Sequence, residues 1–222
     1  MFGTQFDDGS ASDLGTRVGK MSSRAEVVAF YDPPVLPGCS PWLPGVEPSR
    51  EVEVVEPDAA WPVRYEELAS RIRDALGWRA LALEHVGSTS VPDLPAKPII
   101  DIDLIVADPD NESAYVPALE AAGFQLRVRE PWWFSHRMFR FNQPVCNLHI
   151  FGFDSPEPIR HCLFRDWLRA NCTDRDLYAE AKRKAAQAGQ ERGERVMQYN
   201  ARKEEVIRQI YGRAFESMGL LD

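Results

Sequence analysis

The sequence predicts an α+β fold in which helices flank a mixed β-sheet and a helical segment caps the C-terminal side. Three observations support this class. The chain has 222 residues, 44% of them hydrophobic, which suffices to bury one sizeable core. Strand-like and helix-like periodicities alternate between about residues 51 and 151. From Pro158 onward only helical periodicity remains, so strands and helices do not alternate to the end of the chain.

The first elements follow from local patterns. The alternation in EVEVVE predicts a strand over 51–56. Apolar residues at helical spacing predict a helix over 61–76, which Pro62 can begin and Gly77 can end. The run RALALEHV then predicts a strand over 79–86.

The same two periodicities predict the remaining elements. Strands are expected in the runs IIDIDLIVA, FQLRVRE, WFSHRMFRF and VCNLHIFGF. Helices are expected in AYVPALEAAG, IRHCLFRDWLRANC, RDLYAEAKRKAAQA and ERVMQYNARKEEVIRQIYGRA. The segment GSTSVPDLPAKP is expected to be a loop with at most one helical turn.

Residues 1–50 are predicted to be an extension to a domain over residues 51–215. Six prolines between positions 33 and 48 preclude a helix and remove ladder donors. Apolar side chains such as Tyr31 and Trp42 leave two alternatives open. The extension is either a partly disordered tail or a segment clamped onto the domain.

Charge and composition exclude several function classes. A net charge of −8 disfavours a nucleic-acid polymer as partner, because phosphate backbones need a cationic surface. No apolar run approaches the roughly 20 residues of a membrane span, and no signal-peptide pattern is visible. The four cysteines form no CxxC pair and match no zinc signature. We therefore expect a cytoplasmic protein with reduced thiols.

Two acids interrupt the most apolar strand. Asp101 and Asp103 lie in IIDIDLIV, and the period of two places both carboxylates on one face and Ile102 on the other. Two like charges among aliphatic side chains resist desolvation unless a cation neutralises them. Mg²⁺, or Mn²⁺, suits such a pair because it binds one or two carboxylates together with phosphate oxygens. The alternative is a strand end whose acids reach water or a nearby arginine.

A hydroxyl-rich turn precedes this strand. Gly87 permits a tight turn and close approach of a phosphate, and Ser88, Thr89 and Ser90 offer hydroxyl donors. Lys97 would add a positive charge beside this turn. Turns of this kind are usually plain loops. The evidence for a site is therefore the spacing of 13 positions between Ser88 and Asp101. That spacing places a phosphate-binding turn and a metal-binding strand side by side.

The segment EHVGSTSVPDLPAKPIIDIDLIV resembles the signature of the GrpB family, the UPF0157 group. A related domain is fused to some dephospho-CoA kinases. Further similarity lies in VEVVEPDAAWPVRYEELASRI, VCNLHIF, LFRDWLRANCTDRDLYAEAKRKAA and YNARKEEVIRQI. The resemblance covers about residues 51–212 and implies a fold of the nucleotidyltransferase superfamily. Within it, Asp101 and Asp103 match the two metal-binding acids, and Gly87 and Ser88 match the Gly-Ser turn.

The third acid of that superfamily is expected on a later strand, where this chain has Asn147 and His149. A histidine there is usual for GrpB-like chains and departs from the three-carboxylate pattern, which disfavours a two-metal mechanism. One metal held by the two aspartates, with His149 as ligand or proton acceptor, is the more economical picture.

Further candidates for the nucleotide site carry a positive charge or an aromatic ring. Arg137 can hold a phosphate or stack on a base, and Arg165 can point toward the phosphates. Two Tyr-Lys pairs at i, i+4 spacing would line one wall of the site, with rings stacking and lysines on phosphates. These pairs are Tyr178 with Lys182 and Tyr199 with Lys203. For all of them, an ordinary surface or core-boundary position is the alternative.

Together these observations predict a Mg²⁺-dependent nucleotidyltransferase-like enzyme. It would transfer a nucleotidyl group from a nucleoside triphosphate, ATP first among them, to a small-molecule acceptor. The acceptor is either a hydroxyl or a carboxylate activated for amide formation, as in an ATP-dependent ligase. Two rival functions stay open: a non-catalytic nucleotide- or CoA-binding module associated with a kinase, and a metal-dependent phosphohydrolase that uses His149.

Overall fold

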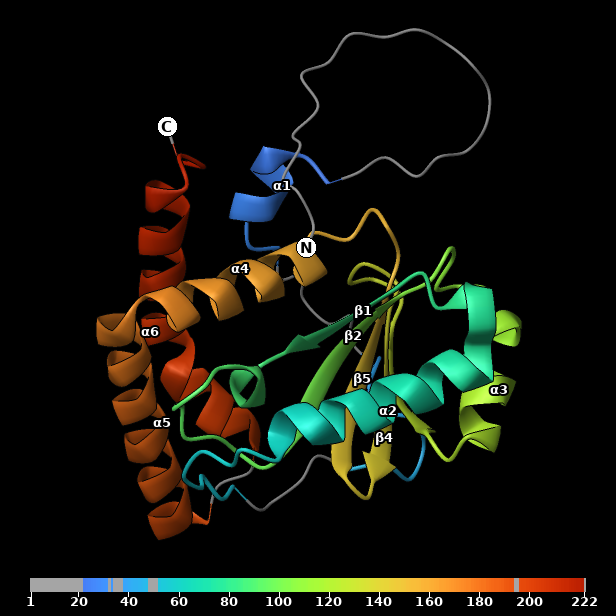
Figure 1. Cartoon of the computed structure of the whole chain (residues 1–222), viewed down its shortest axis with the longest axis horizontal. Helices are drawn as coiled ribbons and strands as arrows, with labels where there is room; N and C mark the ends of the chain where they lie inside the picture. Colours follow the sequence, from blue (N-terminus) through green and yellow to red (C-terminus); the bar gives the residue numbers. More distant parts are fainter. Residues whose placement is uncertain (1–21, 32, 34–37, 48–51, 194–195, 222) are drawn as a thin grey trace, which may run out of the picture.

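Five strands form one mixed sheet with the order β1-β2-β5-β4-β3 (Figure 1). The computed structural model describes residues 22–31, 33, 38–47, 52–193 and 196–221. Strands β2 and β5 pair in parallel, and the other neighbours pair antiparallel. The strands are β1 (Ala82–Val86), β2 (Ile100–Ile105), β3 (Gln125–Glu130), β4 (His136–Asn142) and β5 (Val145–Phe151). The predicted α+β class with a mixed sheet is confirmed.

Helices cover the sheet in two groups. Figure 1 shows α2 across the front of the sheet and α3 beside one end of α2, whereas α4, α5 and α6 gather on the side of β1. The helices are α2 (Trp61–Leu76), α3 (Val116–Ala121), α4 (Glu157–Ala170), α5 (Cys172–Arg192) and α6 (Val196–Ser217). The predicted start and end of α2 are confirmed, because Pro62 lies in its first turn and Gly77 is its C-cap. The C-terminal helical segment is confirmed as well.

The main core lies between the sheet and the helices α2 and α3. Ile102 of β2 and Leu148 of β5 are fully buried in it, together with Leu68 and Ile72 of α2. Because side chains alternate along a strand, the residues next to Ile102 and Leu148 face the other side of the sheet. That side faces away from the main core and carries the polar residues of β2 and β5.

The strand predicted in EVEVVE is wrong within the described residues. Only one isolated bridge, between Val55 and Ala96, is present there. Val52 and Val54 instead pack against the helices, in a cluster that includes Ala185 of α5 and Tyr199 of α6. The alternation arises because the segment is extended and one of its faces is buried. Helices cover that face, and the segment does not pair with a neighbouring strand beyond the single bridge.

The described parts of the extension contact the domain at two places. The short helix α1 (Arg24–Val28) packs against α4 and α6 through Val27 and Val28. Farther along, Trp42 bridges to Val128 of β3, and Leu43 N–H donates to the Arg127 carbonyl at 3.0 Å. Residues 1–21 and 34–37 of the predicted extension lie outside the described residues.

No helix in the described part of the chain combines the length and the apolarity needed to cross a bilayer. All four cysteines lie in that part, and each is a free thiol.

Candidate functional site

Polar side chains of adjacent strands meet on the face of the sheet that lies away from α2. Asp101 is opposite Asn147 and Asp103 is opposite His149 in the parallel β2–β5 register. Arg140 of β4 is in turn opposite Asn147. Residues directly opposite one another share a face, so the five side chains form one polar band across three strands.

Asp101 lies at the partly open end of this band. Its side chain is 29% exposed, and Asn147 Nδ2 donates to its Oδ1 at 2.9 Å. His149 Nε2 lies 3.9 Å from the same oxygen, and Arg140 donates to Asn147 Oδ1 at 2.7 Å. Burial raises the pKa of Asp101, but His149, Asn147 and the charge of Lys97 outweigh it and hold the pKa below its ordinary value.

Asp103 is closed off from solvent and has a resident positive partner. His161 Nδ1 of α4 lies 2.8 Å from its Oδ2. Burial lowers the pKa of His161, but the carboxylates of Asp103 and Glu157 outweigh it and raise the pKa to about 9. His161 is therefore an imidazolium at neutral pH. The other oxygen of Asp103, Oδ1, is buried and has no hydrogen-bond partner among the described residues.

The turn after β1 fits closely against Asp101. Gly87 has φ +68°, and a Cβ at this position would overlap the Asp101 carboxylate, so only glycine fits here. The hydroxyls of Thr89 and Ser90 donate to the backbone carbonyls of Ile99 and Gly87. Both hydroxyls are thus used inside the turn, contrary to their expected role as phosphate ligands. Ser88 is the partly exposed hydroxyl of the turn.

Three lysines gather beside this turn, and we call them the lysine cluster: Lys97, Lys182 and Lys203. Lys182 and Lys203 are only 2% and 8% exposed. Lys182 Nζ donates to the Pro95 carbonyl, and no carboxylate of the described residues lies within 4.0 Å of any of the three. Burial lowers the pKa of all three ammonium groups, to about 8 for Lys203 and well below the ordinary value for Lys182.

The two predicted tyrosines complete the same cluster. Lys203 Nζ lies 4.3 Å from the centroid of the Tyr199 ring, and Lys97 Nζ lies 5.3 Å from it. The Tyr178 ring lies 5.2 Å from Lys182 Nζ, and the neighbouring Ser88 side chain partly offsets the effect of burial, which raises the pKa of Tyr178 to about 12. The structure thus brings both Tyr-Lys pairs to one place, next to the turn and near Asp101. Ring faces partly offset the buried positive charge, but they supply no negative ion.

Carboxylates of the protein already bind the two predicted arginines. Arg137 is buried on the opposite face of β4 from Arg140, where Glu112 lies 2.8 Å from its Nε. Arg137 was expected to hold a phosphate or stack on a base, but Glu112, Asp110 and the Ser135 carbonyl already occupy its donors. Arg165 donates to Glu84 Oε2 at 2.8 Å and to Asp166 Oδ1 at 2.7 Å. Because Glu84 is opposite Asp103 in the β1–β2 register, Arg165 lies on the face of the polar band with these donors occupied.

Sequence reasoning missed four side chains at or beside the polar band. No local sequence pattern singles out His161, yet it contacts Asp103, which is 58 positions away in the chain. His136 lies 3.0 Å from His149, and Glu130 lies 2.7 Å from His136. Strand alternation alone could have favoured Arg140 over Arg137, because it places Arg140 on the face of His136.

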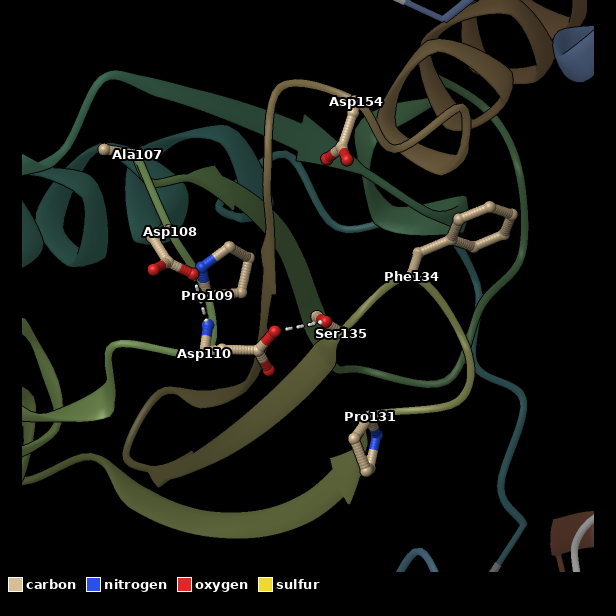
Figure 2. Close-up of a pocket in the computed structure, with 8 residues that line it drawn as sticks. All are labelled: Ala107, Asp108, Pro109, Asp110, Pro131, Phe134, Ser135 and Asp154. Carbon is tan, nitrogen blue, oxygen red and sulfur yellow. Dashed lines mark hydrogen bonds between the residues drawn. The ribbon is translucent and has the colours of Figure 1, made fainter. Parts of the chain in front are cut away.

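A separate cavity of about 300 Å³ lies beyond the other end of β2 (Figure 2). Its lining includes Asp108, Asp110 and Asp154, and Ser135 donates to Asp110 Oδ2 at 2.8 Å. None of the predicted site residues lines it. The carboxylate-rich lining makes it a poor match for phosphate groups.

Comparisons with known proteins agree on one family. A family model described as GrpB protein matches residues 51–213. A UPF0157 protein of Halalkalibacterium halodurans is 48% identical over 166 residues, which cover 75% of this chain and 84% of that protein. A UPF0157 protein of Streptomyces coelicolor is 44% identical over 133 residues, which cover 60% of this chain and 69% of that protein.

Two further matches are a solved structure and a longer enzyme. The crystal structure of a conserved GrpB protein from Enterococcus faecalis aligns with TM-score 0.65 and 31% identity, covering 75% of this chain and 99% of that one. A dephospho-CoA kinase of Mycolicibacterium paratuberculosis is 30% identical over 191 residues, covering 74% of this chain but 46% of the kinase. Similarity therefore extends to under half of that kinase, and the extension before residue 51 lies outside the family model.

Proposed function

The chain belongs to the GrpB family, and we propose that it is a Mg²⁺-dependent nucleotidyltransferase-like enzyme. It transfers a nucleotidyl group from a nucleoside triphosphate, ATP first among the candidates, to a small-molecule acceptor. Mn²⁺ is the alternative ion. The free thiols favour a reducing compartment, so we place the reaction in the cytoplasm.

One observation carries this proposal, namely the lysine cluster. Buried ammonium groups are costly unless a negative group compensates them. Within the described residues no carboxylate contacts the cluster, and Ser88 and Asp101 lie beside it. A triphosphate supplies the missing negative charge, and Tyr178 and Tyr199 offer ring faces to the same ligand.

The residues at Asp101 and Asp103 fit a divalent cation that also binds phosphate. The Oδ1 atom of Asp103 is buried without a partner among the described residues, and the Asp101 side chain is 29% exposed. The described residues contain no group of three or more His, Cys, Asp or Glu side chains that could hold a metal alone. Two carboxylates completed by phosphate oxygens and water are the usual arrangement for Mg²⁺. Bound there, the ion would neutralise phosphate charge.

Other side chains bind the phosphates and accept the proton. The lysine cluster binds and orients the phosphates, and His149 Nε2 accepts a proton from the attacking group. An acceptor oxygen forms a bond to the α-phosphorus, the bond to the bridging oxygen breaks, and pyrophosphate leaves. A hydroxyl acceptor gives a nucleotidylated product. A carboxylate acceptor gives an acyl-adenylate, which an amine then captures as an amide.

The test is pyrophosphate release from each nucleoside triphosphate with Mg²⁺ or Mn²⁺ and a pool of small metabolites. We expect release that the double variant Asp101→Asn, Asp103→Asn abolishes. Asp108→Asn is the matched control, because Asp108 lies on the separate cavity and not on the polar band. Release that the double variant does not change would overturn the proposal, and so would free phosphate without pyrophosphate.

A second candidate is a nucleotide- or CoA-binding module without transfer. The observation that favours it is the ion pair of Asp103 with His161, because this carboxylate already has a positive partner. The similar dephospho-CoA kinase is consistent with such a module beside a kinase. Saturable nucleotide binding without pyrophosphate release would favour this second candidate.

A further inference from the structure

Three side chains form a hydrogen-bonded chain that ends at the polar band. Glu130 at the end of β3 lies 2.7 Å, through its Oε2, from His136 Nδ1. His136 Nε2 lies 3.0 Å from His149 Nδ1, and the two rings stack at an interplanar angle of 22°. His149 Nε2 then faces Asp101 Oδ1 at 3.9 Å.

The direction of the protons follows from which groups can donate. A carboxylate only accepts, so the ring proton of His136 is on Nδ1, facing Glu130. His136 is 4% exposed, with Phe151 stacked on its ring and Trp133 against it edge-on, and an apolar surrounding disfavours a second proton. Its Nε2 therefore accepts, and His149 must donate from Nδ1. This leaves Nε2 as the nitrogen of His149 that is free to take a proton.

We propose that Glu130 and His136 are positioning residues that hold His149 in the tautomer protonated at Nδ1, with the electron pair of Nε2 directed toward Asp101. The tautomer itself follows from hydrogen-bond geometry, whereas its role as proton acceptor rests on the proposed function. The reverse tautomer would aim an N–H at Asp101, and His149 Nε2 would then have no electron pair with which to accept a proton from the attacking group. Second-neighbour partners of this kind commonly fix the working tautomer of a histidine.

The consequence concerns the class of acceptor. A carboxylate attacks in its ionised form and needs no proton acceptor, whereas a hydroxyl or an amine loses a proton as it forms its new bond. A fixed electron pair on His149 Nε2 therefore suits the attack of a hydroxyl on the α-phosphorus, or the capture of an acyl-adenylate by an amine. The proton goes from the attacking group to Nε2.

The direct test is the ring ¹⁵N spectrum of the full chain labelled at histidine, recorded without nucleotide or metal. His149 is assigned by the resonances that disappear in His149→Gln. We expect neutral His149 to carry its proton on Nδ1. In His136→Phe, which keeps an aromatic ring but removes the acceptor, and in Glu130→Gln, this preference should fall to a mixture of tautomers.

The control is Glu120→Gln, an exposed position on α3 that should leave the spectrum of His149 unchanged. The inference is overturned if His149 carries its proton on Nε2 in the unaltered chain, or if both variants keep the original tautomer. Glu130→Gln keeps the test usable if His136→Phe does not fold.

A kinetic measurement separates this inference from the proposed function. If pyrophosphate release is observed, His136→Phe should lower kcat about 10²-fold, the size typical of general acid–base catalysis, and leave KM for the nucleotide unchanged. A rise in KM of the same size with kcat unchanged would overturn the positioning role. If the chain releases no pyrophosphate but the tautomer shift is seen, the proposed transfer fails and the positioning of His149 stands.

Discussion

Two groups of buried cations differ in their counter-charges. On one face of the sheet, Arg137 is bound by Glu112 at 2.8 Å and by Asp110 at 2.9 Å. Beside the other face, the lysine cluster has no carboxylate within 4.0 Å among the described residues. Arg137, Lys182 and Lys203 are all buried, so the difference lies in what compensates their charge.

The difference separates charges that the fold has neutralised from charges that it has left for a ligand. A buried ion pair is held by its geometry and is disrupted when one partner is removed. A buried cation without a counter-ion costs free energy in the empty protein, and an anion that binds there recovers it. Arg160 belongs to the first kind, because Glu157 and the carbonyls of Glu26 and Val27 occupy its guanidinium.

The largest expected effect is that of Arg137→Met on stability. The substitution removes one charged hydrogen bond to Glu112 and one to Asp110, and at about 1.5 kcal/mol each we expect a loss of about 3 kcal/mol in the free energy of unfolding. Nucleotide affinity should not change, because Arg137 lies on the face opposite the polar band. Urea unfolding followed by circular dichroism, together with calorimetric titration of ATP, measures both. If Arg137→Met binds ATP more weakly but unfolds as the unaltered chain does, Arg137 is the cation that a ligand compensates, and the assignment of the two groups is reversed.

The converse substitution is Lys182→Met. Removing an uncompensated buried charge should leave the free energy of unfolding unchanged or raise it. Nucleotide affinity should fall by about 30-fold, which corresponds to about 2 kcal/mol for one lost charged contact. Lys184→Met is the matched control, because Lys184 is on the same helix but exposed and paired with Glu180. If both variants bind ATP equally well, the lysine cluster is not a phosphate site.

The sequence was informative where the answer depends on neighbours along the chain. In IIDIDLIV, alternation separates the core face from the polar face, and the structure has the same separation. Helical spacing also indicated that Tyr178 and Lys182 share a face, and they do. The failure at EVEVVE has the same origin, because alternation shows that one face is buried but not which element covers it.

Contacts between distant elements could not be predicted in this way. The pairing of His161 with Asp103 depends on how α4 crosses the sheet, which no local pattern encodes. The choice between Arg137 and Arg140 depends on the register of β4 with β5, in which Arg140 meets Asn147. The paired and unpaired cations therefore look alike in the sequence and differ only in the folded chain.

The next effect is the pH dependence of nucleotide binding. Lys203 has its pKa lowered to about 8, from 10.5 for a free lysine, chiefly by burial. A bound triphosphate favours the charged form, so affinity should fall by about tenfold per pH unit above pH 8, or about 1.4 kcal/mol. The groups around it that also carry or can carry charge are Lys97, Lys182, Tyr178, Tyr199 and Asp101.

The stability of the empty protein should change in the opposite sense. Between about pH 8 and 10.5 the unfolded chain binds a proton at Lys203 that the folded chain does not, so the free energy of unfolding should rise with pH in this window. ATP titrations and urea unfolding at pH 7, 8 and 9 measure both trends. In Lys203→Met each trend should be shallower, and an unchanged slope would mean that Lys203 keeps its ordinary pKa.

The smallest expected effect tests whether the extension takes part in compensating Arg160. Phe30 is 38% exposed, its ring lies 5.2 Å from that of Tyr211 in an edge-on arrangement, and the Arg160 guanidinium lies 5.4 Å from its centroid. Phe30→Ala should lower the free energy of unfolding by about 1 kcal/mol, the size of one such aromatic contact, without changing nucleotide affinity. Phe153→Ala, at an exposed position with no ring partner among the described residues, should stay within about 0.5 kcal/mol. Equal stability of the two variants would mean that the Phe30 ring adds nothing measurable to the compensation of Arg160, which then rests on Glu157 and the backbone carbonyls.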